Sequence, residues 1–233
     1  MTESEKRYER GGKLKPCSLS RRDLAELTGI IQETFSKAEI DRCFRISTSL
    51  GESRVFDYSL EEFLVRPGLP RDLSDMSFWI EGWDNQGRLD KNILVDFSRY
   101  AISFKVEGAD PVWVYDRHKK LSKYLESKTA WYWPLIFLER FLIFFITILL
   151  VTNVVISFKV RETAFYLDKV ALVGLWVFLV FYDTRKMLPY ADIFLGERRS
   201  LWRKENLYGA LIIILLVVAL AGGTLLPFLK RFH

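Results

Sequence analysis

The chain has 233 residues but only two cysteines and two histidines. Cys17 lies in a polar leader and Cys43 in a predicted strand, so we expect two free thiols rather than a disulfide framework. His118 and His233 are far apart in the sequence. Their separation argues against a histidine-based metal site and against catalysis by a histidine-activated nucleophile.

Enzyme signatures are also lacking. The sequence contains no phosphate-binding loop, dinucleotide fingerprint, zinc-ligand spacing or nucleophile elbow. Acidic pairs such as Glu61 and Glu62 fall on a predicted exposed helix, where solvation explains them. The sequence therefore predicts a protein that is not an enzyme and that binds no cofactor and no metal.

A surplus of positive charge is missing from the first half of the chain. Residues 1–115 carry 17 Lys/Arg and 20 Asp/Glu, whereas residues 116–233 carry 17 and 9. A nucleic-acid groove needs a surplus of cations, and the first half has none. We expect no nucleic-acid partner, and we expect the cations of the second half to meet anionic lipid headgroups of a bilayer.

Charged residues are missing altogether from Phe141 to Phe158. As a helix this run would be about 27 Å long, close to the roughly 30 Å hydrocarbon core of a bilayer. A core helix of a globular domain would show a polar face, and this run shows none. The pattern predicts an all-α transmembrane module of three helices over residues 131–233, with spans at 134–158, 164–182 and 207–229.

Lys and Arg flank these spans unevenly, which predicts their direction through the positive-inside rule. The bias places the first half of the chain and the second loop in the cytoplasm and the C-terminus outside. The residues expected at the membrane interface are Arg117, Lys119, Lys120, Lys123, Trp131, Trp133, Arg198 and Arg199.

The first half shows the patterns of an α+β domain over residues 18–115, after a flexible polar tail at 1–17. A capping box predicts a helix after Ser20, with Asp23 as its partner. About five segments of alternating polarity then predict a mainly antiparallel sheet with flanking helices. A basic juxtamembrane helix is expected over residues 116–130, joining this domain to the first span.

Few residues stand out as sites. Asn153 is expected to form a hydrogen bond between helices, and Ala219 and Gly223 form a small-residue pair suited to helix packing. Trp79 and Trp83 should share one face of a strand, opposite Phe78 and Ile80. We expect this tryptophan pair to lie under a helix, and the alternative is a surface that binds a ligand or a partner.

The leading functional prediction is an integral membrane protein whose cytosolic recognition domain binds a protein or a small ligand and couples it to the transmembrane helices. Two alternatives stay open at this point. One is a membrane-anchored scaffold or subunit of a larger complex, and the other is a ligand-triggered effector that permeabilises membranes, as in prokaryotic defence systems. The expected partners are the bilayer and either further copies of the chain or another protein.

Overall fold

A computed structural model describes residues 7–73, 75–137 and 188–196, together with residues 141, 143, 144, 147, 148, 151, 173, 174, 176, 177, 207, 210, 213 and 214. The chain divides into two compact units. The first comprises Met1–Trp131 and Pro189–Arg199, and the second comprises Tyr132–Leu188 and Ser200–His233.

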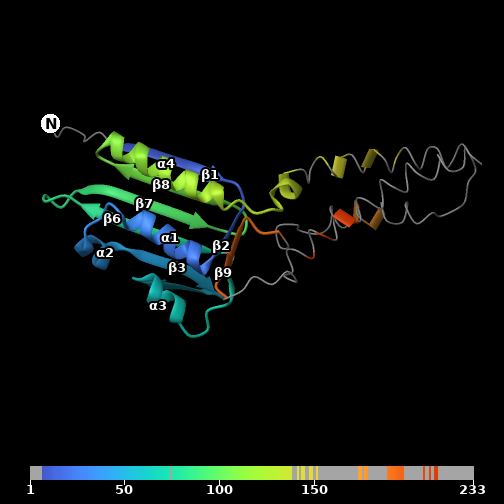
Figure 1. Cartoon of the computed structure of the whole chain (residues 1–233), viewed down its shortest axis with the longest axis horizontal. Coiled ribbons are helices and arrows are strands. Elements are labelled where there is room, and N and C mark those ends of the chain that lie inside the picture. The colour runs from blue at the N-terminus through green and yellow to red at the C-terminus, as the bar shows by residue number, and fades with distance from the viewer. Residues whose placement is uncertain are drawn as a thin grey trace, which may run out of the picture. The chain divides into compact units, whose positions relative to one another are not determined.

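The first unit is built on a six-stranded sheet with the order β1-β8-β7-β6-β3-β4, in which all neighbours are antiparallel (Figure 1). Hairpins connect β3 to β4, β6 to β7 and β7 to β8, and the first strand of the chain joins the edge beside β8. The strands are β1 (Tyr8–Leu14), β3 (Arg45–Leu50), β4 (Ser53–Asp57), β6 (Met76–Trp83), β7 (Leu89–Phe97) and β8 (Ile102–Gly108).

A smaller sheet has the order β2-β9-β5 and links distant parts of the chain. It consists of β2 (Cys17–Ser20), β5 (Asp72–Leu73) and β9 (Ala191–Phe194). Strand β9 pairs in parallel with β2, where Cys17 lies opposite Ala191, and antiparallel with β5. Residues 189–196 therefore belong to the first unit although they are distant from the rest of it in the sequence.

Each of the four helices described in the first unit begins at a polar residue whose side chain accepts a hydrogen bond from a backbone N–H of the first turn. Ser20 with Asp23 and Ser36 with Glu39 form complete capping boxes, and Asp110 caps a helix that has proline at its start. The helices are α1 (Arg21–Gln32), α2 (Lys37–Cys43), α3 (Leu60–Val65) and α4 (Pro111–Ser127).

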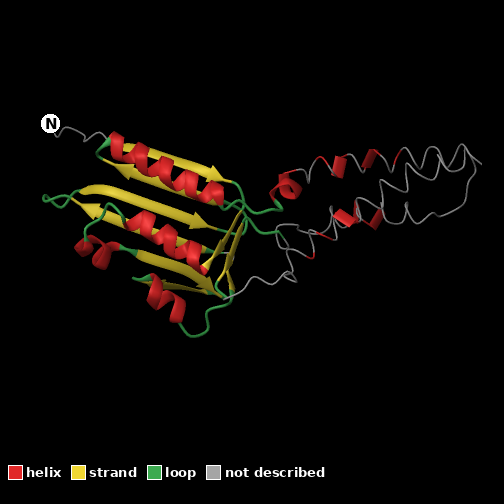
Figure 2. Ribbon diagram, in the orientation of Figure 1, coloured by secondary structure: helices red, strands yellow, loops and turns green. Residues whose placement is uncertain are grey.

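The two long helices, α1 and α4, lie on the same face of the large sheet (Figure 2). The hydrophobic core lies between these helices and the sheet. It contains Phe44 and the alternate strand residues that point toward the helices, such as Phe78 and Phe97, which are fully buried. Arg117 of α4 is also buried and donates to Glu33 at the end of α1 over 2.6 Å. This ion pair and the apolar contacts hold the two helices together above the sheet.

Several predicted elements are confirmed, and others differ. The capping box at Ser20 is present as expected, and two of the strands lie at residues 45–50 and 76–83, whereas Cys43, expected in a strand, is the last residue of α2. Residues 8–14, expected within a flexible tail, form β1 along the edge of the sheet. The helix expected to begin at residue 116 begins earlier, at Pro111, because Asp110 caps it there.

The second unit requires a correction. No helix among the described residues is both long and apolar enough to cross a bilayer. Most of the predicted spans 134–158, 164–182 and 207–229 lies outside the described residues.

On this finding we correct every prediction that depended on a transmembrane module. These are the fold class with its three spanning helices, the multi-pass integral membrane location with a cytoplasmic domain and an external C-terminus, and the coupling of a recognition domain to membrane helices. The membrane-anchored scaffold and the membrane-permeabilising effector depended on the same spans and are withdrawn with them.

Candidate functional site: the open face of the sheet

The face of the large sheet opposite α1 and α4 has no described element of the first unit packed over it (Figure 2). Side chains alternate between the two faces along each strand, and the pairing registers show which alternate residues of neighbouring strands share a face. One set of alternate residues therefore points to the open face across the whole sheet. We define the open face by Glu9, Gly11, Lys13, Arg45, Ser47, Ser49, Arg54, Phe56, Ser77, Trp79, Glu81, Trp83, Asn92, Leu94, Asp96, Ser103, Lys105 and Glu107.

Apolar side chains lie across the middle of the open face. Trp79 of β6 is paired directly with Leu94 of β7, and the two residues are 38% and 37% exposed. Phe56, on the edge strand β4, is 53% exposed. A large apolar side chain that stays in water loses the stabilisation that burial would give it, which is about 1.5–3 kcal/mol for a complete side chain. An apolar strip on a sheet face therefore favours a partner.

The indole of Trp79 is held in one orientation. Its Nε1 donates to Asn92 Oδ1 over 3.1 Å, and the guanidinium of Arg45 lies 5.5 Å from the ring centroid. Both neighbours come from adjacent strands, β7 and β3, so the ring is fixed from two sides. A side chain that is already ordered loses less conformational entropy when a partner binds.

A polar network lies beside the apolar strip. Ser77 Oγ donates to Asp96 Oδ1 over 2.6 Å, and Arg54 donates to the hydroxyls of Ser77 and Ser47 over 3.0 and 3.3 Å. These contacts join strands β4, β3, β6 and β7 across the face. Because the polar groups satisfy one another within the domain, a partner could cover them without leaving them unpaired.

The opposite edge of the face is also charged and internally paired. Lys105 Nζ lies 3.1 Å from a carboxylate oxygen of Glu107 and 3.1 Å from one of Glu9. Hydrogen bonds with Glu107 and, to a smaller extent, with Glu9 raise the pKa of Lys105 above its ordinary value. Next to this cluster, the absence of a side chain at Gly11 contributes to a shallow hollow of about 470 Å³.

Charges of both signs are balanced on the open face. Four cations, Lys13, Arg45, Arg54 and Lys105, are matched by four anions, Glu9, Glu81, Asp96 and Glu107. A surface that binds phosphates carries a clear surplus of cations, and this face has no such surplus. Its features are those of a protein interface, with an apolar and aromatic centre and a polar rim.

The structure places the predicted tryptophan pair here and corrects the expectation that a helix covers it. Trp79 and Trp83 do share one face of β6, and Phe78 and Ile80 are buried on the other. Trp83 is 49% exposed near the hairpin that follows β6. The covering helix was expected because aromatic strands are often buried on both sides, but α1 and α4 both lie on the Phe78 side.

The other predicted site residues are not part of this face. Arg117 and Lys120 of α4 contact Glu33 of α1, so they join the two helices, whereas Lys119 and Lys123 are exposed on α4. Trp131 is exposed, and Trp133 packs against Phe137 with ring centroids 5.2 Å apart. The remaining predicted residues, Arg198, Arg199, Asn153, Ala219 and Gly223, lie outside the described residues.

Sequence reasoning missed the partners that fix Trp79, namely Arg45, Asn92 and Leu94. Each occupies the predicted outward position of a strand, so alternation alone places them on one side. What alternation does not give is which strands are neighbours, and the order β7-β6-β3 is needed to bring the three together.

These features define the first unit as an α+β domain in which helices cover one face of an antiparallel sheet and the other face is open. No protein-family model, curated protein or solved structure matches the chain.

Proposed function

We propose that the α+β domain is a protein-interaction module whose open sheet face binds the same face of a second copy of the chain. The observation that supports this proposal is the ordered apolar strip of Trp79 and Leu94, set among equal numbers of cations and anions. The proposed role is binding rather than catalysis.

Charge balance favours a second copy over other occupants. In a dimer with two-fold symmetry the same patch is presented by both subunits, so it must be complementary to itself. A face with four cations and four anions meets this requirement, because a rotated copy can place each cluster near one of opposite sign. A strongly acidic or basic partner would leave half of these charges facing like charges.

The size of the face is also adequate. Six strands about 4.8 Å apart, each contributing about 24 Å of length, cover roughly 700 Å². Two such faces would bury about 1,400 Å² in total, which lies within the roughly 1,200–2,000 Å² of a standard stable interface. Two sheets packed this way would be about 10 Å apart, close enough for Trp79 and Leu94 to interdigitate with their copies.

Sedimentation velocity of the full-length chain over a range of concentrations tests the proposal. We expect a reversible monomer–dimer equilibrium. Leu94→Lys places an unpaired charge at the centre of the interface and should weaken dimerisation by at least about 100-fold.

The matched control is Val112→Lys, which makes the same kind of change at an exposed position of α4, on the other side of the sheet. This variant should dimerise like the unmodified chain. A chain that stays monomeric at all concentrations, or equal dimerisation of the two variants, would refute the proposed function.

A further inference from the structure

A groove of about 920 Å³ lies on the opposite side of the domain from the open face, between α1, α2 and α3 and the residues that follow β9. Its volume is in the range of pockets that enclose small ligands. The groove shares no residue with the open face, so a ligand could bind here whether or not the open face forms a dimer.

One wall of the groove is the outward stripe of α1. Arg21, Ala25, Gly29 and Gln32 recur at helical spacing along it, and all line the groove. A Cβ added at Gly29 would meet no atom within 4 Å. The small side chains at positions 25 and 29 therefore leave open space in the middle of the wall.

Thr28 supplies an unpaired polar group to this wall. The side chain lines the groove and is only 7% exposed, yet its hydroxyl has no hydrogen-bond partner in the described part of the chain. Buried polar atoms in folded proteins nearly always have a partner. A hydroxyl can donate one hydrogen bond and accept others, so it matches a peptide group, which carries an N–H and a C=O.

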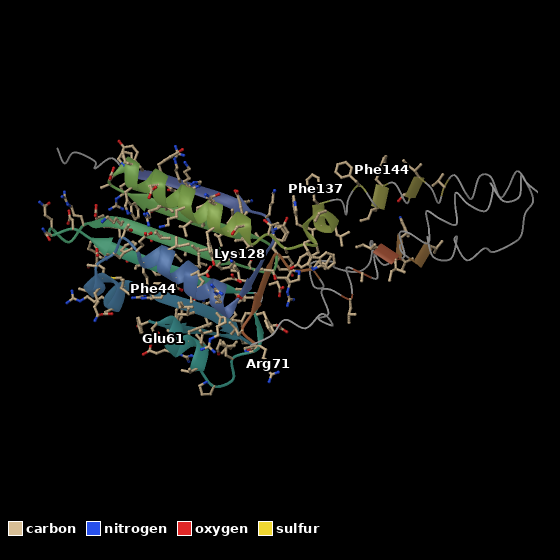
Figure 3. The ribbon with its side chains drawn as sticks, in the orientation of Figure 1. Phe44, Glu61, Arg71, Lys128, Phe137 and Phe144 are labelled. Atoms are coloured by element: carbon tan, nitrogen blue, oxygen red, sulfur yellow. The ribbon has the colours of Figure 1, made fainter. Side chains whose placement is uncertain are left out.

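The two ends of the groove have opposite charge. Arg21 and Arg22 begin α1, immediately after β2. Asp41 lies on α2, which follows the end of α1, and Glu61 lies in the first turn of α3 (Figure 3), so both line the groove toward its other end. They come together because Ile46 at the start of β3 is paired with Asp57 at the end of β4, which brings the end of α2 close to the beginning of α3.

The distance between the ends follows from the helix. From Arg21 to Gln32, the steps of α1 extend about 16 Å. An extended chain of about five residues covers the same length. The remaining wall includes the apolar side chains of Ile40, Leu60, Leu64 and Leu195, which suit aliphatic side chains of a ligand.

We propose that this groove binds a short extended peptide of about five residues with free termini. The carboxylate of the peptide lies at Arg21 and Arg22, its ammonium group lies at Asp41 and Glu61, and the Thr28 hydroxyl forms a hydrogen bond with a peptide group between them. Aliphatic side chains of the peptide contact Leu60 and Leu64.

Isothermal titration of the full-length chain with the pentapeptide Ala-Leu-Ala-Leu-Ala tests this proposal. We expect saturable binding at one site per chain. Acetylating the N-terminus of the peptide and amidating its C-terminus each remove one charge and should each lower the affinity about two- to fivefold. An absence of binding up to about 5 mM peptide, or equal affinity for the charged and the capped forms, would overturn the proposal.

Variants of the chain locate the site. Gly29→Leu fills the open space of the wall and should reduce the affinity by more than about 100-fold. Ala38→Leu adds the same side chain at an exposed position of α2 outside the groove and should leave binding unchanged. Equal binding by these two variants would show that the peptide binds elsewhere and would refute the assignment.

Thr28→Val separates a binding role from a structural one. The change removes the hydroxyl but keeps the shape of the side chain, so peptide affinity should fall about two- to tenfold. The melting temperature of the peptide-free chain should rise, because an unpaired buried hydroxyl is replaced by a methyl group. A fall in melting temperature, or unchanged affinity, would contradict the role assigned to Thr28.

Discussion

Two glycines of the domain should respond in opposite ways to the same substitution. Gly29 lies in the interior of α1, where an added Cβ meets nothing within 4 Å. At Gly82 of β6 the same Cβ would come 2.6 Å from Glu39 Oε1 and 3.2 Å from the ring of Phe35. Glu39 is the capping-box partner of Ser36, so it cannot move away without losing a contact that fixes the start of α2.

The magnitudes follow from helix propensity and from the cap. Gly29→Ala should stabilise the domain by about 0.5–1 kcal/mol, because alanine loses less backbone entropy than glycine in a helix. Gly82→Ala should destabilise it by about 1–2 kcal/mol through loss of the cap and crowding of Phe35. For a unit of about 140 residues, 1 kcal/mol corresponds to a shift in melting temperature of about 3 °C.

Urea denaturation of the full-length chain, followed by tryptophan fluorescence, measures both changes. The expected result is a higher midpoint for Gly29→Ala and a lower midpoint for Gly82→Ala, with similar slopes. A Gly29→Ala variant no more stable than the unmodified chain would refute the reasoning, since it would mean that position 29 is crowded. A neutral Gly82→Ala variant would equally contradict the close packing of β6 against α2.

Three further predictions concern single side chains of the domain. Partial burial against Phe104 lowers the pKa of His118, so the imidazole binds a proton less tightly in the folded state than in the unfolded state. The free energy of unfolding should therefore fall as the pH drops below about 6.5. A profile that is flat with pH, or an equal slope in His118→Asn, would contradict this. Burial raises the pKa of the Cys17 thiol to about 12. Iodoacetamide at pH ~8 should therefore label Cys43 in the native protein and Cys17 only after unfolding. Labelling of Cys17 in the native protein would show that this thiol is accessible. Phe78→Ala should cost about 3–5 kcal/mol in urea denaturation because the ring is fully buried in the core, and a loss below about 1 kcal/mol would mean that the core does not form as described.

Local patterns in the sequence predicted local structure well. The Ser20–Asp23 capping box and the alternation of β6 depend on residues that are close in the sequence, and the structure confirms both. Alternation also predicted that Trp79 and Trp83 share a face. These signals arise from backbone geometry, which repeats every 3.6 or two residues whatever the rest of the chain does.

Long-range pairing could not be predicted in the same way. As an edge strand, β1 needs only its backbone to pair with β8, so its side chains can be charged or absent, as at its two glycines. Its sequence therefore looks like that of a flexible tail. Strand β9 joins β2 in parallel from a distant part of the chain, and no local pattern reports such a partner. Whether a helix covers Trp79 and Trp83 depends on the side of the sheet on which α4 packs. Tertiary contacts determine that side, and no local sequence pattern reports it.

The groove illustrates the same limit. In the sequence, Thr28 is a small polar residue between the apolar and the polar face of a predicted helix, and nothing distinguishes it from its neighbours. Only the packing of α1 beside α2 and α3 shows that its hydroxyl is buried without a partner among the described residues. The charges at the two ends of the groove come from three helices, and their arrangement depends on the β3–β4 hairpin.

The most direct test of a dimer formed through the open face is oxidative crosslinking of Leu94→Cys in a Cys43→Ser background of the full-length chain. Leu94 lies on β7, one of the two central strands, so near a two-fold axis it should face its own copy. We predict a covalent dimer that forms rapidly with Leu94→Cys and not with Val112→Cys. Equal crosslinking of both variants, or none with Leu94→Cys at concentrations where the chain is dimeric, would contradict the proposed interface.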